Sequence, residues 1–77
     1  MKWDQKFKPI ALKDGRTIGS LQESRLLISA LPDPHPESFH WRYASELLVK
    51  AAERGERYAV MDARAQFARA LRTEGLL

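Results

Sequence analysis

Short alternating runs of apolar and polar residues near the start of the chain flank the dipeptide Asp14-Gly15. The run from Phe7 to Leu12 predicts a strand, with Pro9 suited only to its start or to an edge. Residues 16–18 predict a returning strand, and Asp-Gly is a turn dipeptide because glycine adopts a positive φ without steric cost. We expect an antiparallel hairpin that packs on helices, because a two-stranded sheet alone is barely stable in water.

A capping box predicts where the first helix begins. Ser20 precedes Glu23 by three residues, so the serine hydroxyl can accept from the Glu23 amide while the glutamate reaches back. The helix should run to about Leu31, because the prolines of segment 32–36 cannot continue it. Leu26 lies on the far side of this helix from its apolar stripe, which contains Leu21, Ser24, Leu27, Ile28 and Leu31.

Two longer helices are predicted after the proline-rich segment. One begins near Ser38 and ends at Gly55, a typical glycine just past a helix end. The other runs from about Tyr58 to Glu74 and has the clearest helical period in the chain. The order β-β-α-α-α predicts a single α+β domain of residues 1–77, with a two-stranded antiparallel hairpin packed on three helices. The predicted core contains Ile10, Leu12, Ile18, Leu27, Ile28, Leu47, Leu48, Ala51, Val60, Phe67 and Leu71.

Composition narrows the classes of function. The 77 residues are 44% hydrophobic and 30% charged, which is typical of a globular chain rather than a disordered one. The chain has no cysteine, which excludes disulfides, thiol catalysis, iron–sulfur clusters and the common structural zinc sites. The sequence contains no signal-peptide pattern and no apolar stretch near the roughly 20 residues of a membrane span. We therefore expect a cytoplasmic protein that does not enter a membrane.

Candidate catalytic and metal-binding residues are sparse. His35 and His40 are five residues apart with Glu37 between them, whereas helical metal sites use spacings of three or four and need further ligands. We expect His40 to be a half-buried histidine that is hydrogen-bonded near a helix start. No serine lies in a nucleophile-elbow motif, and the four glycines are too scattered for a phosphate-binding loop. The sequence therefore predicts a protein that is not an enzyme and that binds no metal or cofactor.

The net charge of +3 lies entirely in the first sixteen residues. A basic segment can meet phosphate, but lysines at a strand edge also stay solvated and block unwanted sheet pairing. The solvent side of the predicted third helix carries three arginines, Arg64, Arg69 and Arg72. They form either an ordinary solvated helix face or part of a basic surface that binds nucleic acid. Non-specific nucleic-acid binding is therefore an alternative function. It requires these arginines to form one patch with Lys2, Lys6, Lys8, Lys13 and Arg16.

Aromatic residues cluster near the start of the second helix, where Trp41 and Tyr43 occur. Large aromatics in a small chain belong mostly to the core, but Trp and Tyr are also enriched at interface hot spots. Leu26 lies off the stripe of its helix and adds apolar surface. We predict a small non-catalytic interaction or regulatory module that binds a protein partner or forms a homodimer. Its predicted contact residues are Trp41, Leu26 and Tyr43.

A set of short motifs spread over nearly the whole chain carries a family resemblance. They are Phe7-x-Pro9-Ile10, Arg16-x-Ile18-x-Ser20, Pro32, Ala44…Ala51…Gly55 and Ala63-Arg64-x-x-Phe67-x-x-Ala70…Gly75. With these motifs the chain resembles the small bacterial proteins grouped as domain of unknown function 982. The resemblance implies a compact α+β fold and no assigned activity.

Overall fold

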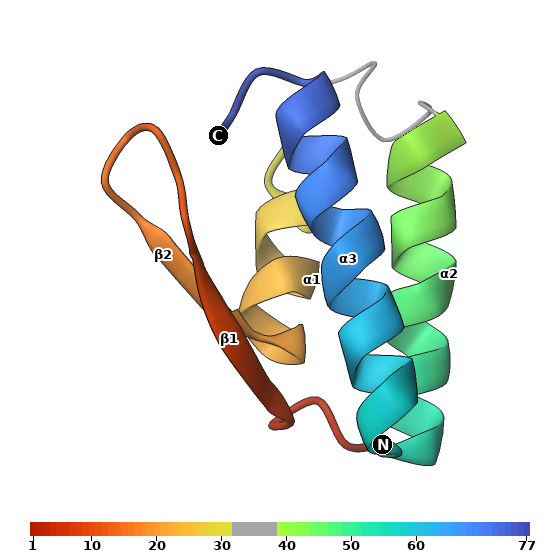
Figure 1. Ribbon diagram of the computed structural model, residues 1–77. Coiled ribbons are helices and arrows are strands. Elements are labelled where there is room, and N and C mark those ends of the chain that lie inside the picture. Colours follow the sequence, from red (N-terminus) through yellow and green to blue (C-terminus); the bar gives the residue numbers. More distant parts are fainter. Residues whose placement is uncertain (32–38) are drawn as a thin grey trace.

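The structure, a computed structural model, describes residues 1–31 and 39–77. Strands β1 (Lys6–Ala11) and β2 (Thr17–Ser20) form a two-stranded antiparallel sheet. Helices α1 (Leu21–Ser29), α2 (Phe39–Arg54) and α3 (Arg57–Thr73) follow, and α2 and α3 lie side by side along their length (Figure 1). The predicted ββααα order of an α+β fold is confirmed. The proline-rich segment and the predicted helix start at Ser38 lie outside the described residues.

An irregularity in β1 decides which of its side chains reach the core. The paired residues are Lys6 with Ser20 and Ile10 with Ile18, so three residues of β1 stand where β2 has only Gly19. Pro9 lies in this interval. Proline has no backbone N–H, and at an irregular position of the strand the sheet loses no hydrogen bond through its absence. The irregularity shifts the two-residue alternation by one position, so that Phe7, Ile10 and Leu12 are all buried.

The hairpin turn is held by Asp14. Its carboxylate accepts from the backbone N–H of Arg16 at 3.0 Å and from the Arg16 guanidinium at 2.7 Å. The backbone hydrogen bond from Arg16, reinforced by its guanidinium, lowers the pKa of the exposed Asp14 from its ordinary value. Gly15 follows with φ of +97°, the conformation that the Asp-Gly dipeptide predicts.

The predicted capping box opens α1, with one change. Ser20 Oγ accepts from the Glu23 N–H at 3.1 Å, and the Glu23 carboxylate accepts from the N–H of Gly19 at 2.8 Å. The return bond therefore goes to the N–H of Gly19, the residue before the cap, rather than to that of Ser20. The helix ends at Ser29, two residues before the predicted Leu31.

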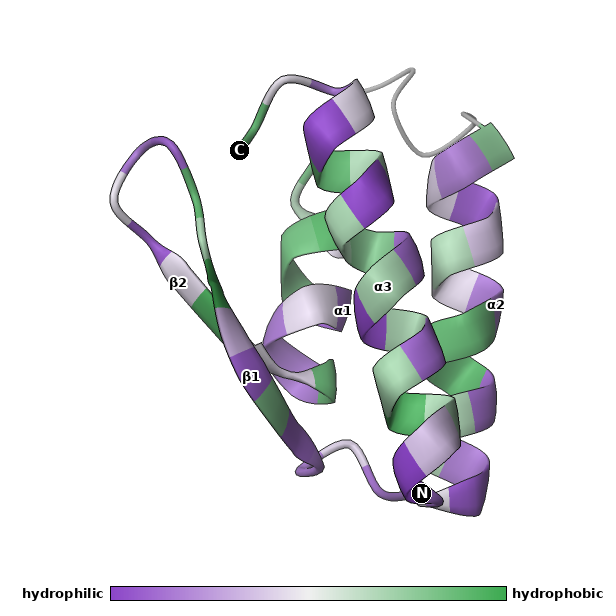
Figure 2. Cartoon of the chain, viewed as in Figure 1, coloured by the Kyte–Doolittle hydropathy of each residue, from purple (hydrophilic) through white to green (hydrophobic). Residues whose placement is uncertain are grey.

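The core lies between the sheet and the three helices. Nine of the predicted core residues are buried, whereas Ile28 and Leu47 are half-buried and pack against its margin. The core also contains residues that the prediction omitted, namely Phe7, Leu21, Trp41, Ala44, Ala52, Ala59, Ala63 and Ala70. In Figure 2, hydrophobic and hydrophilic residues alternate along α3, as expected of a helix with one buried side.

Replacing Ser20 with alanine tests the cap of α1. Ser20→Ala leaves the Glu23 N–H without its acceptor and should lower the free energy of unfolding by about 1 kcal/mol. Ser29→Ala is the control, because the Ser29 hydroxyl donates to the Arg25 carbonyl without capping a helix end. We expect its effect to stay within about 0.5 kcal/mol. Urea denaturation measures the free energy of unfolding of both variants. An equal decrease in the two would contradict the role of Ser20 as the cap.

Candidate functional site

Trp41 is a core residue in this structure rather than a surface contact. Its side chain is 0% exposed, and its ring packs against that of Phe67 with centroids 6.1 Å apart. Its position follows from the helical period, because Ala44 and Leu48, three and seven residues further on, are buried on the same side of α2. The indole Nε1 has no hydrogen-bond acceptor within the described chain. The prediction of Trp41 as a partner contact is corrected accordingly.

Tyr43 belongs to a group of exposed aromatic side chains on the outer side of α2 and α3. Its side chain is 44% exposed and stacks on Phe39, which is 81% exposed, with ring centroids 6.3 Å apart. Leu47 continues this row one turn further along α2. On α3, Tyr58 is 56% exposed and accepts at its hydroxyl from Arg54 at 3.0 Å. We call Phe39, Tyr43, Leu47 and Tyr58 the aromatic face.

Two hollows lie along the aromatic face. The first, of about 410 Å³, is lined by Phe39, Tyr43 and Arg69 together with neighbouring polar residues. The second, of about 120 Å³, is lined by Leu47, Tyr58 and residues around them. Because each hollow is formed by side chains of both α2 and α3, the two helices together present a contoured surface rather than a flat one.

Leu26 is exposed on a different side of the molecule. It is 55% exposed and lines a hollow with Thr17 and Ile18, next to the hairpin. The hairpin and α1 lie on one side of the α2–α3 pair in Figure 1. The three predicted contact residues are therefore not brought together, since one is buried and the other two lie on separate surfaces. Phe39 and Tyr58 were not among the predicted contact residues. For Phe39 the sequence did hold a signal, because residues four apart, such as Phe39 and Tyr43, lie on the same side of a helix.

Two arginines of α3 close the edge of β1 that is not paired with β2. Arg64 Nε donates to the Lys8 carbonyl at 2.7 Å, and Arg57 donates to the Lys6 carbonyl at 3.2 Å. These carbonyls belong to alternate residues and point to the same side of the strand. The contacts satisfy backbone groups that a free sheet edge would expose. They also place Arg57 and Arg64 beside Lys6 and Lys8 of β1, and we call these four residues the basic seam.

The other predicted cations are distributed over several places. Lys2 lies at the α2–α3 turn, where its N–H donates to Ala52 and its side chain contacts Gly55. Lys13 donates its N–H to Leu76 near the end of α3, while Arg16 is paired with Asp14 at the hairpin tip. Arg69 borders the aromatic face, and Arg72 is exposed on α3. The structure thus brings Lys6, Lys8 and Arg64 together, adds Arg57, and leaves the remaining cations apart.

His40 and Glu74 tie the start of α2 to the end of α3. His40 Nε2 lies 2.8 Å from a Glu74 carboxylate oxygen, and both side chains are partly buried. This is the half-buried, hydrogen-bonded histidine that the sequence predicts. Among residues 1–31 and 39–77, no group of three or more histidine and acidic side chains could hold a metal ion. His35 lies outside these residues, and no helix of the described chain is long and apolar enough to cross a membrane.

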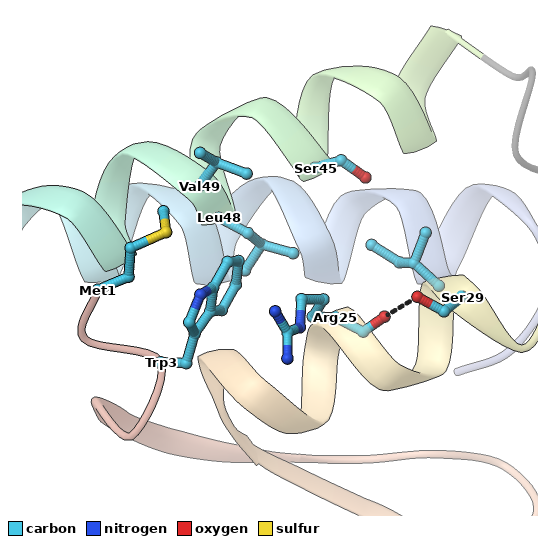
Figure 3. Close-up of a pocket in the computed structure, with 8 residues that line it drawn as sticks. Met1, Trp3, Arg25, Ser29, Ser45, Leu48 and Val49 are labelled. Carbon is cyan, nitrogen blue, oxygen red and sulfur yellow. Dashed lines mark hydrogen bonds between the residues drawn. The ribbon is translucent and has the colours of Figure 1, made fainter.

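A further pocket lies elsewhere, between α1, α2 and the segment before β1. It has a volume of about 460 Å³ (Figure 3). Its lining residues are Met1, Trp3, Arg25, Ile28, Ser29, Ser45, Leu48 and Val49. No pattern in the sequence marks this pocket, because Trp3 and Arg25 come from segments that only the tertiary fold brings beside α2.

Comparison of the chain with models of known protein families, with curated proteins and with solved structures finds no match. The resemblance to domain of unknown function 982 therefore stays a prediction from the motifs. The protein is therefore described by its fold, an α+β domain in which a two-stranded hairpin packs on three helices. Its surface carries the aromatic face, the basic seam and the pocket beside Trp3.

Replacing Arg64 tests whether α3 secures the edge of β1. Arg64→Met keeps an apolar stem of similar length but removes the donor to the Lys8 carbonyl, and should lower the free energy of unfolding by about 1 kcal/mol. Arg72→Met is the matched control, because Arg72 is exposed on the same helix, and its effect should stay within about 0.5 kcal/mol. Chemical denaturation measures both. A neutral Arg64→Met would show that the bond adds nothing to stability.

Proposed function

We propose that the protein is a non-catalytic interaction module that forms a homodimer through the aromatic face. The observation that carries this proposal is the exposure of Phe39, Tyr43 and Tyr58 on the outer side of one helix pair. A chain of this size buries its aromatics where it can, and those left in water mark a surface that gains free energy when covered. A cytoplasmic location stays a prediction from the sequence.

The chemistry of the aromatic face resembles that of interface centres. Aromatic residues and arginine are enriched in such surfaces, and here Arg54 and Arg69 flank the aromatic side chains. Arg54 already orients the Tyr58 hydroxyl, so part of the ordering cost of binding is met before contact. A second copy of the chain offers the same pair of helices, and two such pairs can pack as an antiparallel four-helix arrangement.

The extent of the face sets the expected strength of the dimer. Helices of 16 and 17 residues are about 25 Å long, and two adjacent helices make a face about 20 Å wide. Such a contact covers on the order of 500 Å² per partner, below the roughly 800 Å² of a standard interface. We therefore expect weak association, with a dissociation constant of about 10–300 μM.

Sedimentation equilibrium over about 5 μM to 1 mM tests the dimer. The unsubstituted protein should shift from monomer to dimer across this range, whereas Phe39→Glu and Tyr58→Glu should each stay monomeric. Leu26→Glu is the matched control, because it adds the same charge at an exposed leucine away from the aromatic face, and it should dimerise normally. A protein that remains monomeric at about 1 mM, or a dimer that only Leu26→Glu disrupts, would refute the proposal.

Nucleic-acid binding is the second candidate, and the basic seam is the observation that favours it. Lys6, Lys8, Arg57 and Arg64 converge where β1 meets α3, and none of them pairs with a carboxylate among the described residues. Such a group of cations can contact a phosphate backbone. Arg16, in contrast, is already occupied by Asp14 and lies at the hairpin tip.

Titration of the labelled protein with a short DNA duplex at two salt concentrations tests this candidate. Four phosphate contacts predict a log–log salt slope of about −3.6, which Lys6→Gln with Lys8→Gln should reduce in magnitude by about 2. Lys50→Gln on α2 removes one positive charge away from the seam and serves as control, with an expected change in slope near zero. Amide shifts should map to β1 and the first half of α3. Spectra that do not change at low salt would eliminate nucleic acid as a partner.

A further inference from the structure

We propose that the pocket between α1, α2 and Trp3 binds a small apolar carboxylate. In this assignment Arg25 holds the carboxylate, and the apolar body of the ligand lies against Trp3, Leu48 and Val49. The site is separate from the homodimer contact, because Val49 lies about 120° around α2 from Tyr43, in the middle of the row formed by Phe39, Tyr43 and Leu47.

The shape and lining of the pocket suit a small molecule. Its volume of about 460 Å³ falls within the range of roughly 300–1,000 Å³ that small-molecule sites occupy. Leu48 is buried at its base, Ile28 is half-buried at the side of α1, and Val49 is exposed at the side of α2. These aliphatic groups and the Trp3 ring make a mostly apolar wall, as in sites where a few polar groups set the orientation of the ligand.

Arg25 is the charged side chain of the pocket lining, which also contains Met1 with its α-amino group. Its guanidinium lies 4.4 Å from the centre of the Trp3 ring, and one of its N–H groups donates to the Gln22 side chain at 2.9 Å. Stacking and hydrogen bonding fix the plane of the group before any ligand binds, so little side-chain entropy remains to be lost. Its other N–H groups have no hydrogen-bond partner among the described residues, and no acidic side chain lines the pocket.

These two features together define the ligand class. A planar guanidinium with free N–H groups pairs with a carboxylate through two parallel hydrogen bonds, and an apolar wall requires an apolar body. A phosphate or nucleotide is a poorer match, because a mostly apolar lining leaves a doubly charged group poorly compensated. Ser29 already donates to the Arg25 carbonyl at 3.0 Å, so Ser45 is the hydroxyl that remains to contact the ligand (Figure 3).

A pair of probes that differ only in charge tests the assignment. 3-Phenylpropionate carries the carboxylate and an aryl body, and 3-phenylpropanamide keeps the body without the charge. For ligands of this size we expect a dissociation constant of about 0.1–1 mM for the acid. Titration with 3-phenylpropionate should shift the NMR signals of the Trp3 indole N–H and of the backbone N–H groups of Arg25 and Val49. We expect 3-phenylpropanamide to bind at least fivefold more weakly than the acid.

Variants separate the charge contact from the apolar contacts. Arg25→Gln should weaken binding of the acid at least fivefold and leave binding of the amide unchanged, so a damaged fold is distinguished from a lost ion pair. Arg72→Gln is the control, since this arginine is exposed on α3 away from the pocket, and it should bind both probes normally. Equal affinity for acid and amide, shifts outside the pocket, or no shift at about 10 mM acid would overturn the proposal.

Discussion

Packing of α2 against α3 is the contact on which the rest of the structure depends. Six alanines on these helices, at positions 44, 51, 52, 59, 63 and 70, are buried, and small side chains allow two helix backbones to approach closely. Trp41 and Phe67 fill the wider end of the interface with a tilted aromatic pair. Gly55, with φ of +68°, reverses the chain between the helices and brings them antiparallel. The aromatic face depends on this packing directly, because side chains of both helices form it.

The hairpin depends on that helix pair in turn. Two strands cannot bury enough surface alone, and here they gain it by covering the core with Phe7, Ile10 and Ile18. The carbonyls of Lys6 and Lys8 are satisfied by arginines of α3 rather than by a third strand. One result is protection of the sheet edge, and another is that two arginines lie beside two lysine residues of β1. The same contacts that complete the fold therefore create the basic seam.

Two different sides of α2 present two different chemistries. The side that carries Phe39, Tyr43 and Leu47 is a shallow aromatic surface shared with α3, whereas the side that carries Val49 faces α1 and the Trp3–Arg25 pair. A shallow aromatic surface suits another protein, because association gains from area. A pocket with one oriented charge suits a small ligand, because binding gains from enclosure. Because these two sides of α2 do not overlap, the helix can contact a second copy of the chain and a small ligand at the same time.

The sequence by itself determined the local structure. The capping residue Ser20, the Asp14-Gly15 turn and the glycines at positions 55 and 75 mark element boundaries through interactions within a few residues, and helical spacing identified most of the core. Only the tertiary structure decided which outward residues meet. Phe7 entered the core through the irregularity at Pro9, Arg57 and Arg64 reached β1 across more than fifty residues, and Trp3 met Arg25 beside α2. Such juxtapositions depend on how the elements pack against one another. The period of a helix shows which side is buried, but not which residue of another element an outward side chain will meet.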